Sequence, residues 1–118
     1  MRRIIIAIAL IVLPVAGVAC GGAKSPAACD ARSATTTIDI QNNAFAPACV
    51  GAKAGAMLSI VNHDDTPHTF TVKNTSLNVK IDAGATASAA LTGIAPGTYA
   101  VICAYHPQMT ATLQVGSS

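Results

Sequence analysis

From residue 35 onward, hydrophobic residues occur in short runs that alternate with polar residues and end at turns rich in glycine, proline, asparagine and aspartate. Alternation with a period of two predicts β-strands that bury one face, and no helical period continues past residue 30. The expected strands are 35–40, 49–50, 57–61, 68–72, 79–81, 86–91, 97–102 and 112–115. About eight short strands at this spacing predict an all-β fold, a Greek-key sandwich or barrel.

The alanine-rich run 83–90 is open to two interpretations. Alanine is the best helix former, so composition alone would favour a helix. However, Thr86 and Ser88 alternate with alanines, and turn residues flank the run. We therefore assign this run to a strand of the sandwich.

The start of the chain differs from the rest because ten apolar residues, 4–13, follow Met1-Arg2-Arg3. A basic start, a short apolar run and an exit of small residues are typical of an export signal. The run is interrupted by Pro14 and is shorter than the roughly 20 residues that a membrane-spanning helix needs. We therefore expect residues 1–19 to be a signal peptide.

Cys20 directly follows the small-residue exit. Its position resembles that of the lipid-modified cysteine in bacterial lipoproteins, although Gly17 stands where leucine is usual. We expect a lipid on Cys20, a flexible tether over 20–34 and the folded domain over 35–118. This places the domain at the outer face of a cell membrane or in a periplasm. The alternative is ordinary cleavage near Ala19, which would release a soluble periplasmic or secreted protein.

Charge and aromatic content argue against nucleic acid as a partner. The net charge of +2 falls to zero without the two arginines of the leader, and the remaining charges are scattered along the chain. The sequence contains two tyrosines, two phenylalanines and no tryptophan. Neither a basic stripe nor a stacking surface is therefore predicted.

The segment 103–109 combines three residue types that bind copper. Cys103, His106 and Met109 follow one another at steps of three residues after a predicted strand, and His68 begins an upstream strand. One thiolate, two imidazoles and a long axial thioether form the blue-copper (type 1) electron-transfer site. A zinc site would favour more thiolates or imidazoles and would not use methionine. The sequence thus predicts one copper ion bound by these four residues.

Enzymatic alternatives find less support in the sequence. A nucleophilic Cys–His pair would need a third, orienting residue, and none is evident. Asp64 and Asp65 are interpreted as turn residues, because acid–base catalysis requires a pocket that the sequence does not predict. His63 is interpreted as a solvated loop residue. We therefore do not expect an enzyme.

The four cysteines, Cys20, Cys29, Cys49 and Cys103, can be divided among three tasks. If the first carries lipid and the last binds metal, Cys29 and Cys49 remain to form a disulfide in the oxidising environment that export implies. That bridge would close a loop of about 20 residues and add roughly 3 kcal/mol of stability. Alternatively, Cys103 pairs with one of them and the other stays free, because connectivity cannot be deduced from sequence.

Three segments, 45–47, 62–69 and 96–109, together resemble the small cupredoxins of the amicyanin and plastocyanin type, and the resemblance spans about residues 35–115. It implies that the copper ligands are His68, Cys103, His106 and Met109. It also implies that the Asn62 side chain ties the two ligand-bearing loops together.

The resemblance further implies a monomeric carrier of single electrons, with transient redox-protein partners that dock near His106. An apolar patch would surround this histidine, and its candidate members are Ala44 or Phe45, Pro67, Ala104 and Pro107. A copper-handling lipoprotein, which stores or delivers the metal without a redox chain, is the alternative. A plain sandwich module without metal is a third possibility.

Overall fold

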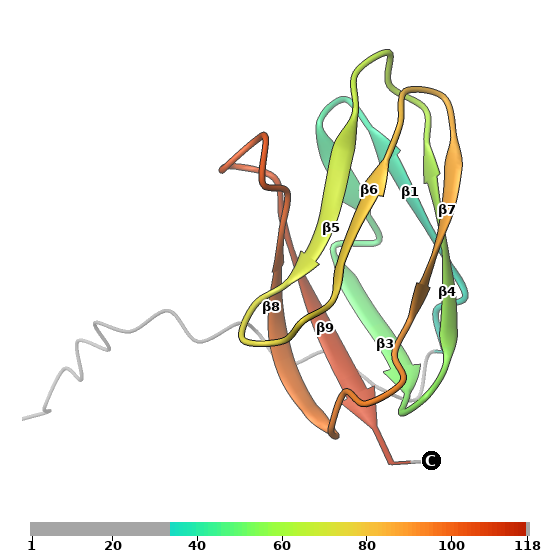
Figure 1. The fold of residues 1–118 in the computed structure, drawn as a ribbon, viewed down its shortest axis with the longest axis vertical. Helices are drawn as coiled ribbons and strands as arrows, with labels where there is room; N and C mark the ends of the chain where they lie inside the picture. The colour runs from blue at the N-terminus through green and yellow to red at the C-terminus, as the bar shows by residue number, and fades with distance from the viewer. Residues whose placement is uncertain (1–33, 118) are drawn as a thin grey trace, which may run out of the picture.

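The computed structural model describes residues 34–117 and contains nine strands and no helix in that range (Figure 1). The strands are β1 (Thr37–Gln41), β2 (Ala44–Ala46), β3 (Cys49–Lys53), β4 (Met57–Asn62), β5 (His68–Val72), β6 (Asn78–Ile81), β7 (Thr86–Ala90), β8 (Gly97–Ile102) and β9 (Thr110–Gly116). The alanine-rich run forms strand β7, as its alternation predicted.

The strands form two sheets that face each other. One sheet has the order β2-β1-β4-β7 and the other has the order β3-β9-β8-β5-β6. Two pairs, β1 with β4 and β3 with β9, are parallel, and all other pairs are antiparallel. The predicted all-β sandwich is thereby confirmed.

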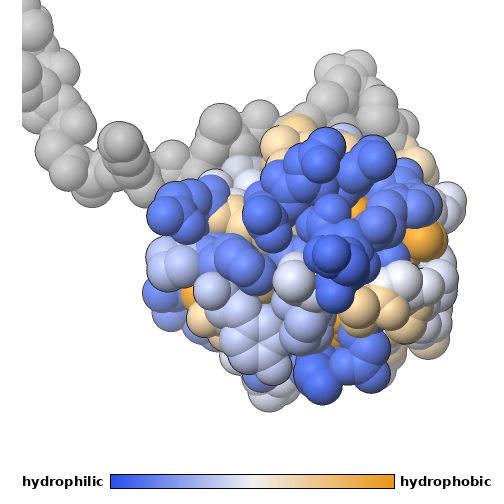
Figure 2. Space-filling view, turned by 90° about the horizontal axis from the view of Figure 1, so that it is seen from above, coloured by the Kyte–Doolittle hydropathy of each residue, from blue (hydrophilic) through white to orange (hydrophobic). Residues whose placement is uncertain are grey.

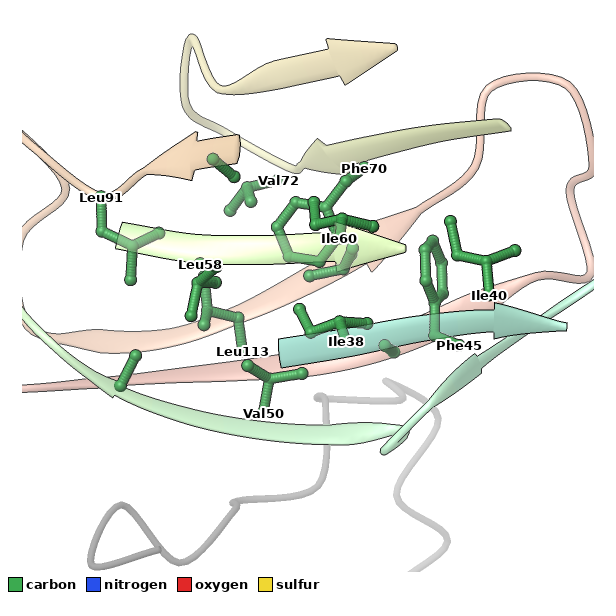
Figure 3. Packing of buried hydrophobic residues seen from close by; sticks show 14 of the residues in the cluster. Ile38, Ile40, Phe45, Val50, Leu58, Ile60, Phe70, Val72, Leu91 and Leu113 are labelled. Atoms are coloured by element: carbon green, nitrogen blue, oxygen red, sulfur yellow. The ribbon is translucent and has the colours of Figure 1, made fainter. Parts of the chain in front are cut away.

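Alternating side chains from both sheets fill the space between them (Figure 3). The largest buried side chain is Phe70 of β5, and its ring meets that of Phe45 of β2 edge to face, with centroids 5.9 Å apart. Such aromatic pairs stabilise a core beyond their buried area. Phe45 is only 4% exposed, so it cannot belong to the apolar surface patch proposed above.

Four turns meet at one end of the sandwich, the upper end in Figure 1. They are the β1–β2 turn (42–43), the β4–β5 loop (63–67), the β6–β7 turn (82–85) and the β8–β9 loop (103–109). Because β4 and β8 run toward this end and β5 and β9 run away from it, the predicted ligands at strand ends gather there. The fold therefore brings residues from two distant parts of the chain to one point.

The predicted signal peptide 1–19, the lipidation site Cys20, the disulfide partner Cys29 and the tether 20–33 lie outside the described residues. Ala34, the last residue of the expected tether, forms a parallel β-bridge with Gly51. Cys49 is disulfide-bonded, and its pairing with Cys29 stays a prediction. In the part of the chain that the structure describes, no helix has the length and hydropathy needed to span a membrane.

Candidate metal centre

Strand ends deliver the predicted ligands to the loop end of the sandwich. His68 is the first residue of β5, Cys103 directly follows β8, and Met109 directly precedes β9. His106 lies in the loop between the last two. Ligand atoms of His68, Cys103 and His106 all lie within 4.8 Å of one another.

The geometry of these three side chains suits a metal ion. The Sγ atom of Cys103 lies 3.7 Å from Nδ1 of His68 and 3.7 Å from Nδ1 of His106. A metal–sulfur bond of about 2.3 Å and a metal–nitrogen bond of about 2.0 Å at an angle of roughly 120° place sulfur and nitrogen about 3.7 Å apart. One thiolate and two imidazoles at this spacing therefore fit a trigonal arrangement around one ion.

Backbone hydrogen bonds close the 103–109 loop into a compact turn. The N–H of Cys103 donates to the carbonyl oxygen of Met109 at 3.1 Å. The N–H of Met109 donates to the carbonyl oxygen of His106 at 2.9 Å. The N–H of His106 donates to the carbonyl oxygen of Cys103 at 3.3 Å. The Met109 side chain is buried, with the residue 2% exposed. Its role as the fourth ligand stays a prediction.

The Cys103 sulfur is surrounded by hydrogen-bond donors. Burial alone would raise the pKa of this thiol, but opposing hydrogen bonds, led by that from the N–H of Thr69 at 3.4 Å, lower it to about 6. The residue itself is 1% exposed. The site is thus built for a thiolate, which is the form that binds metals.

Thr69 connects the two ligand-bearing segments. Its N–H donates to the Cys103 sulfur, and its hydroxyl oxygen accepts the N–H of Ala104 at 2.8 Å. The hydroxyl also contacts that of Thr71 at 3.0 Å. Sequence reasoning did not identify Thr69, although its position directly after a ligand histidine was a usable signal.

Asn62 ties the β4–β5 loop to the end of β6. Its side-chain NH₂ group lies 2.8 Å from the carbonyl oxygen of Thr66, 3.3 Å from that of Ile81 and 3.1 Å from that of Asp82. Its side-chain oxygen accepts the N–H of Asp64 at 3.0 Å. The expected tie between the two ligand loops is therefore made by Thr69, whereas Asn62 fixes the loop that precedes His68.

Asp64 is a second residue whose role the sequence did not indicate. One carboxylate oxygen lies 2.9 Å from Nε2 of His68, and the carboxylate also accepts the N–H groups of Asn42 and Asn43. The hydrogen bond from Asn43, helped by those from Asn42 and His68, keeps the pKa of Asp64 below its usual value against the effect of burial. Asp64 thus carries a negative charge next to a predicted ligand.

The surface around the site is largely polar. Figure 2 views the molecule from the end where the four turns meet and shows mainly hydrophilic residues on that face. His63 is exposed and pairs with Asp39 at 2.8 Å, in agreement with its interpretation as a solvated loop residue. Tyr105 is 51% exposed beside the loop's ligands. Ala44, Pro67, Ala104 and Pro107, the remaining candidates for an apolar patch, are all exposed.

Comparison with known proteins identifies the family. The cupredoxin-like domain family matches residues 5–115. No curated protein matches the chain. Among solved structures, a reduced Cu(I) form of an amicyanin mutant at pH 4 is 20% identical with a TM-score of 0.58, covering 80% of this chain and 95% of that one. A purple cupredoxin from Nitrosopumilus maritimus is 18% identical with a TM-score of 0.59, and the match covers 69% of this chain and 99% of the purple cupredoxin.

A copper-containing nitrite reductase from Thermus scotoductus SA-01 is 22% identical with a TM-score of 0.59 over 71% of this chain. The match covers 23% of the reductase chain, so this chain spans only about a quarter of that protein. At these identities the solved structures support the fold alone. The family match over nearly the whole sequence carries more weight: the chain belongs to the cupredoxin-like family, and its donor set points to one copper ion.

Proposed function

We propose that the protein carries single electrons with a copper ion bound by His68, Cys103, His106 and Met109. The observation that supports this most directly is the convergence of one thiolate and two imidazole nitrogens at spacings of 3.7 Å. Copper in such a site cycles between Cu(II) and Cu(I). The spacing of the three donors fits a single ion.

The burial of the donors supports retention of the metal rather than its delivery. His68 is fully buried and Cys103 is 1% exposed, so a copper acceptor would reach neither without opening the loop. His106 is partly exposed and is the ligand through which we expect electrons to enter and leave. The alternative of copper storage or delivery predicts transfer of the metal to an acceptor, whereas a carrier keeps it through repeated oxidation and reduction.

We expect partners to dock on the loop end around His106. The hydrophilic face in Figure 2 favours small, transient encounters, because such electron-transfer contacts bury little surface. Export, a lipid on Cys20 and a monomeric state complete the proposal. These three features rest on the sequence and the resemblance rather than on the described residues.

Copper-binding spectra test the proposal. On addition of Cu(II), the wild-type protein is expected to develop an intense blue or purple absorption from thiolate charge transfer. The Cys103→Ser variant is expected to lose this band completely, because a hydroxyl cannot supply it. Thr71→Ser, a change outside the donor set, is the matched control and is expected to keep the colour. A colourless wild-type protein would overturn the proposal.

Replacing Tyr105 with proline is expected to lower the reduction potential by about 40–90 mV. The N–H of Tyr105 helps to lower the pKa of the Cys103 thiol and so stabilises negative charge on the sulfur, which favours the reduced site. Loss of about 1–2 kcal/mol of this stabilisation corresponds to that shift for one electron. Tyr105→Ala keeps the N–H and serves as the control in protein-film voltammetry. Equal potentials for the two variants would contradict the assignment.

A further inference from the structure

The carboxylate of Asp64 forms hydrogen bonds with three nitrogen atoms. Its Oδ1 atom accepts the N–H of Asn42 at 2.7 Å, and its Oδ2 atom accepts the N–H of Asn43 at 2.9 Å. The same Oδ2 atom lies 2.9 Å from Nε2 of His68. The His68 side chain is fully buried and that of Asp64 is 14% exposed, so water competes little for this contact.

We infer that Asp64 is a positioning residue that fixes His68 in the tautomer required for copper binding and favours the oxidised state of the site. The inference rests on the proposed function, because it assigns a role at the same metal centre. An ionised carboxylate only accepts hydrogen bonds, so Nε2 of His68 must carry the hydrogen. The lone pair then lies on Nδ1, the nitrogen that faces the Cys103 sulfur at 3.7 Å.

Hydrogen bonds from other segments fix the position of Asp64. Asn42 and Asn43 both have left-handed backbone conformations, with φ of 53° and 56°. The turn that they form directs both N–H groups to the Asp64 carboxylate, and successive backbone N–H groups in such a turn can bind an anion. On the other side, the N–H of Asp64 donates to the side-chain oxygen of Asn62. The β1–β2 turn therefore anchors a ligand that lies on the neighbouring sheet.

The charge of Asp64 determines the direction of its effect on the metal. A carboxylate hydrogen-bonded to a ligand imidazole raises the basicity of that ligand. A more basic imidazole and a nearby negative charge both stabilise the higher positive charge of Cu(II) relative to Cu(I). Removing the charge is therefore expected to weaken Cu(II) binding more than Cu(I) binding.

The experiment compares Asp64→Asn with Asp65→Asn, an exposed neighbour that loses the same charge. In Asp64→Asn the ratio of Cu(II) to Cu(I) affinity is expected to fall by about 10- to 100-fold, and the reduction potential is expected to rise accordingly. Asp65→Asn is expected to change the ratio less than threefold. Equal ratios in the two variants would overturn the inference.

A second measurement is made on the protein without copper. Nitrogen-15 NMR of the imidazole rings is expected to show His68 with its hydrogen on Nε2 only, and Asp64→Asn is expected to show a mixture of tautomers. A wild-type His68 with its hydrogen on Nδ1 would overturn the inference even if the variant failed to fold. A wild-type protein that forms no coloured copper complex, yet shows the Nε2 tautomer, would instead contradict the proposed function and leave the positioning of His68 supported.

Discussion

The copper-free protein is expected to become more stable toward unfolding by up to about 4 kcal/mol as the pH rises from 6 to 9, because of one thiol. The pKa of Cys103 falls from the usual 9.0 to about 6 in the folded protein. Between these values the folded state holds a thiolate, whereas the unfolded chain holds a thiol. The unfolded state binds one more proton, so stability increases with pH across this range.

The sign of this effect follows from the environment of the sulfur. Burial opposes the thiolate, and hydrogen bonds led by that from the N–H of Thr69 outweigh it. The stabilisation is complete above pH 9 and is lost as the pH falls to 6. Urea unfolding of the copper-free protein at pH 6, 7.5 and 9 measures it. Cys103→Ala lacks the thiol, so the slope that it retains belongs to other groups and is subtracted.

An equal pH dependence in the wild type and in Cys103→Ala would contradict this prediction. The comparison also bears on metal binding. A thiol that has already lost its proton near neutral pH releases no proton when copper binds, so the affinity for copper should depend weakly on pH above 7. Below pH 6, copper must displace a proton, and the apparent affinity should fall about tenfold for each pH unit.

Local patterns were sufficient to predict most of the strands and the three converging donors. Alternation identifies a strand when it continues over five or six residues, as in β4 and β8. It missed β2, which has three residues and ends directly before Pro47. Within this short strand Phe45 points into the core, with Ala44 and Ala46 exposed on either side. Without the strand assignment, Phe45 remained an alternative to Ala44 as a member of the surface patch.

The supporting contacts of the site could not be predicted because they join distant segments. Asp64 was interpreted as a turn residue, and that interpretation is compatible with its position in the β4–β5 loop. Its further role depends on the Asn42-Asn43 turn, which lies 21 to 22 residues away in sequence and reaches it only through the parallel pairing of β1 with β4. The contact between Thr69 and Cys103 spans 34 residues and likewise depends on β5 lying next to β8.

These contacts give the two histidines different surroundings. His68 is fully buried and is held through Nε2 by Asp64, which in turn is fixed by two backbone N–H groups. His106 sits in the loop, partly exposed, with backbone bonds to Cys103 and Met109. The rings lie with their centroids 4.8 Å apart. One histidine thus anchors the site to the sandwich, and the other faces the surface where we expect partners to dock.

Replacing Asn62 with leucine is expected to destabilise the copper-free protein by about 3 kcal/mol. Leucine has a similar volume but cannot replace the hydrogen bonds to the carbonyl oxygens of Thr66, Ile81 and Asp82, or accept the N–H of Asp64. Asn62 is 1% exposed and its hydrogen bond to the carbonyl oxygen of Ile81 is buried, so at least that group would lose its partner without gaining water. Each buried polar group left without a partner costs about 1–3 kcal/mol, and relaxation of the loop recovers part of that.

Asn78→Leu provides the control, because Asn78 is exposed on β6 and accepts one hydroxyl hydrogen bond, from Thr71. Its loss of stability should stay below about 1 kcal/mol. Denaturant unfolding of both copper-free variants at one pH measures the difference. A loss for Asn62→Leu no larger than for Asn78→Leu would mean that packing alone holds the β4–β5 loop. A larger loss would mean that the loop carrying Asp64 is kept in place by Asn62, so that the orientation of His68 depends on two polar side chains that do not touch the metal.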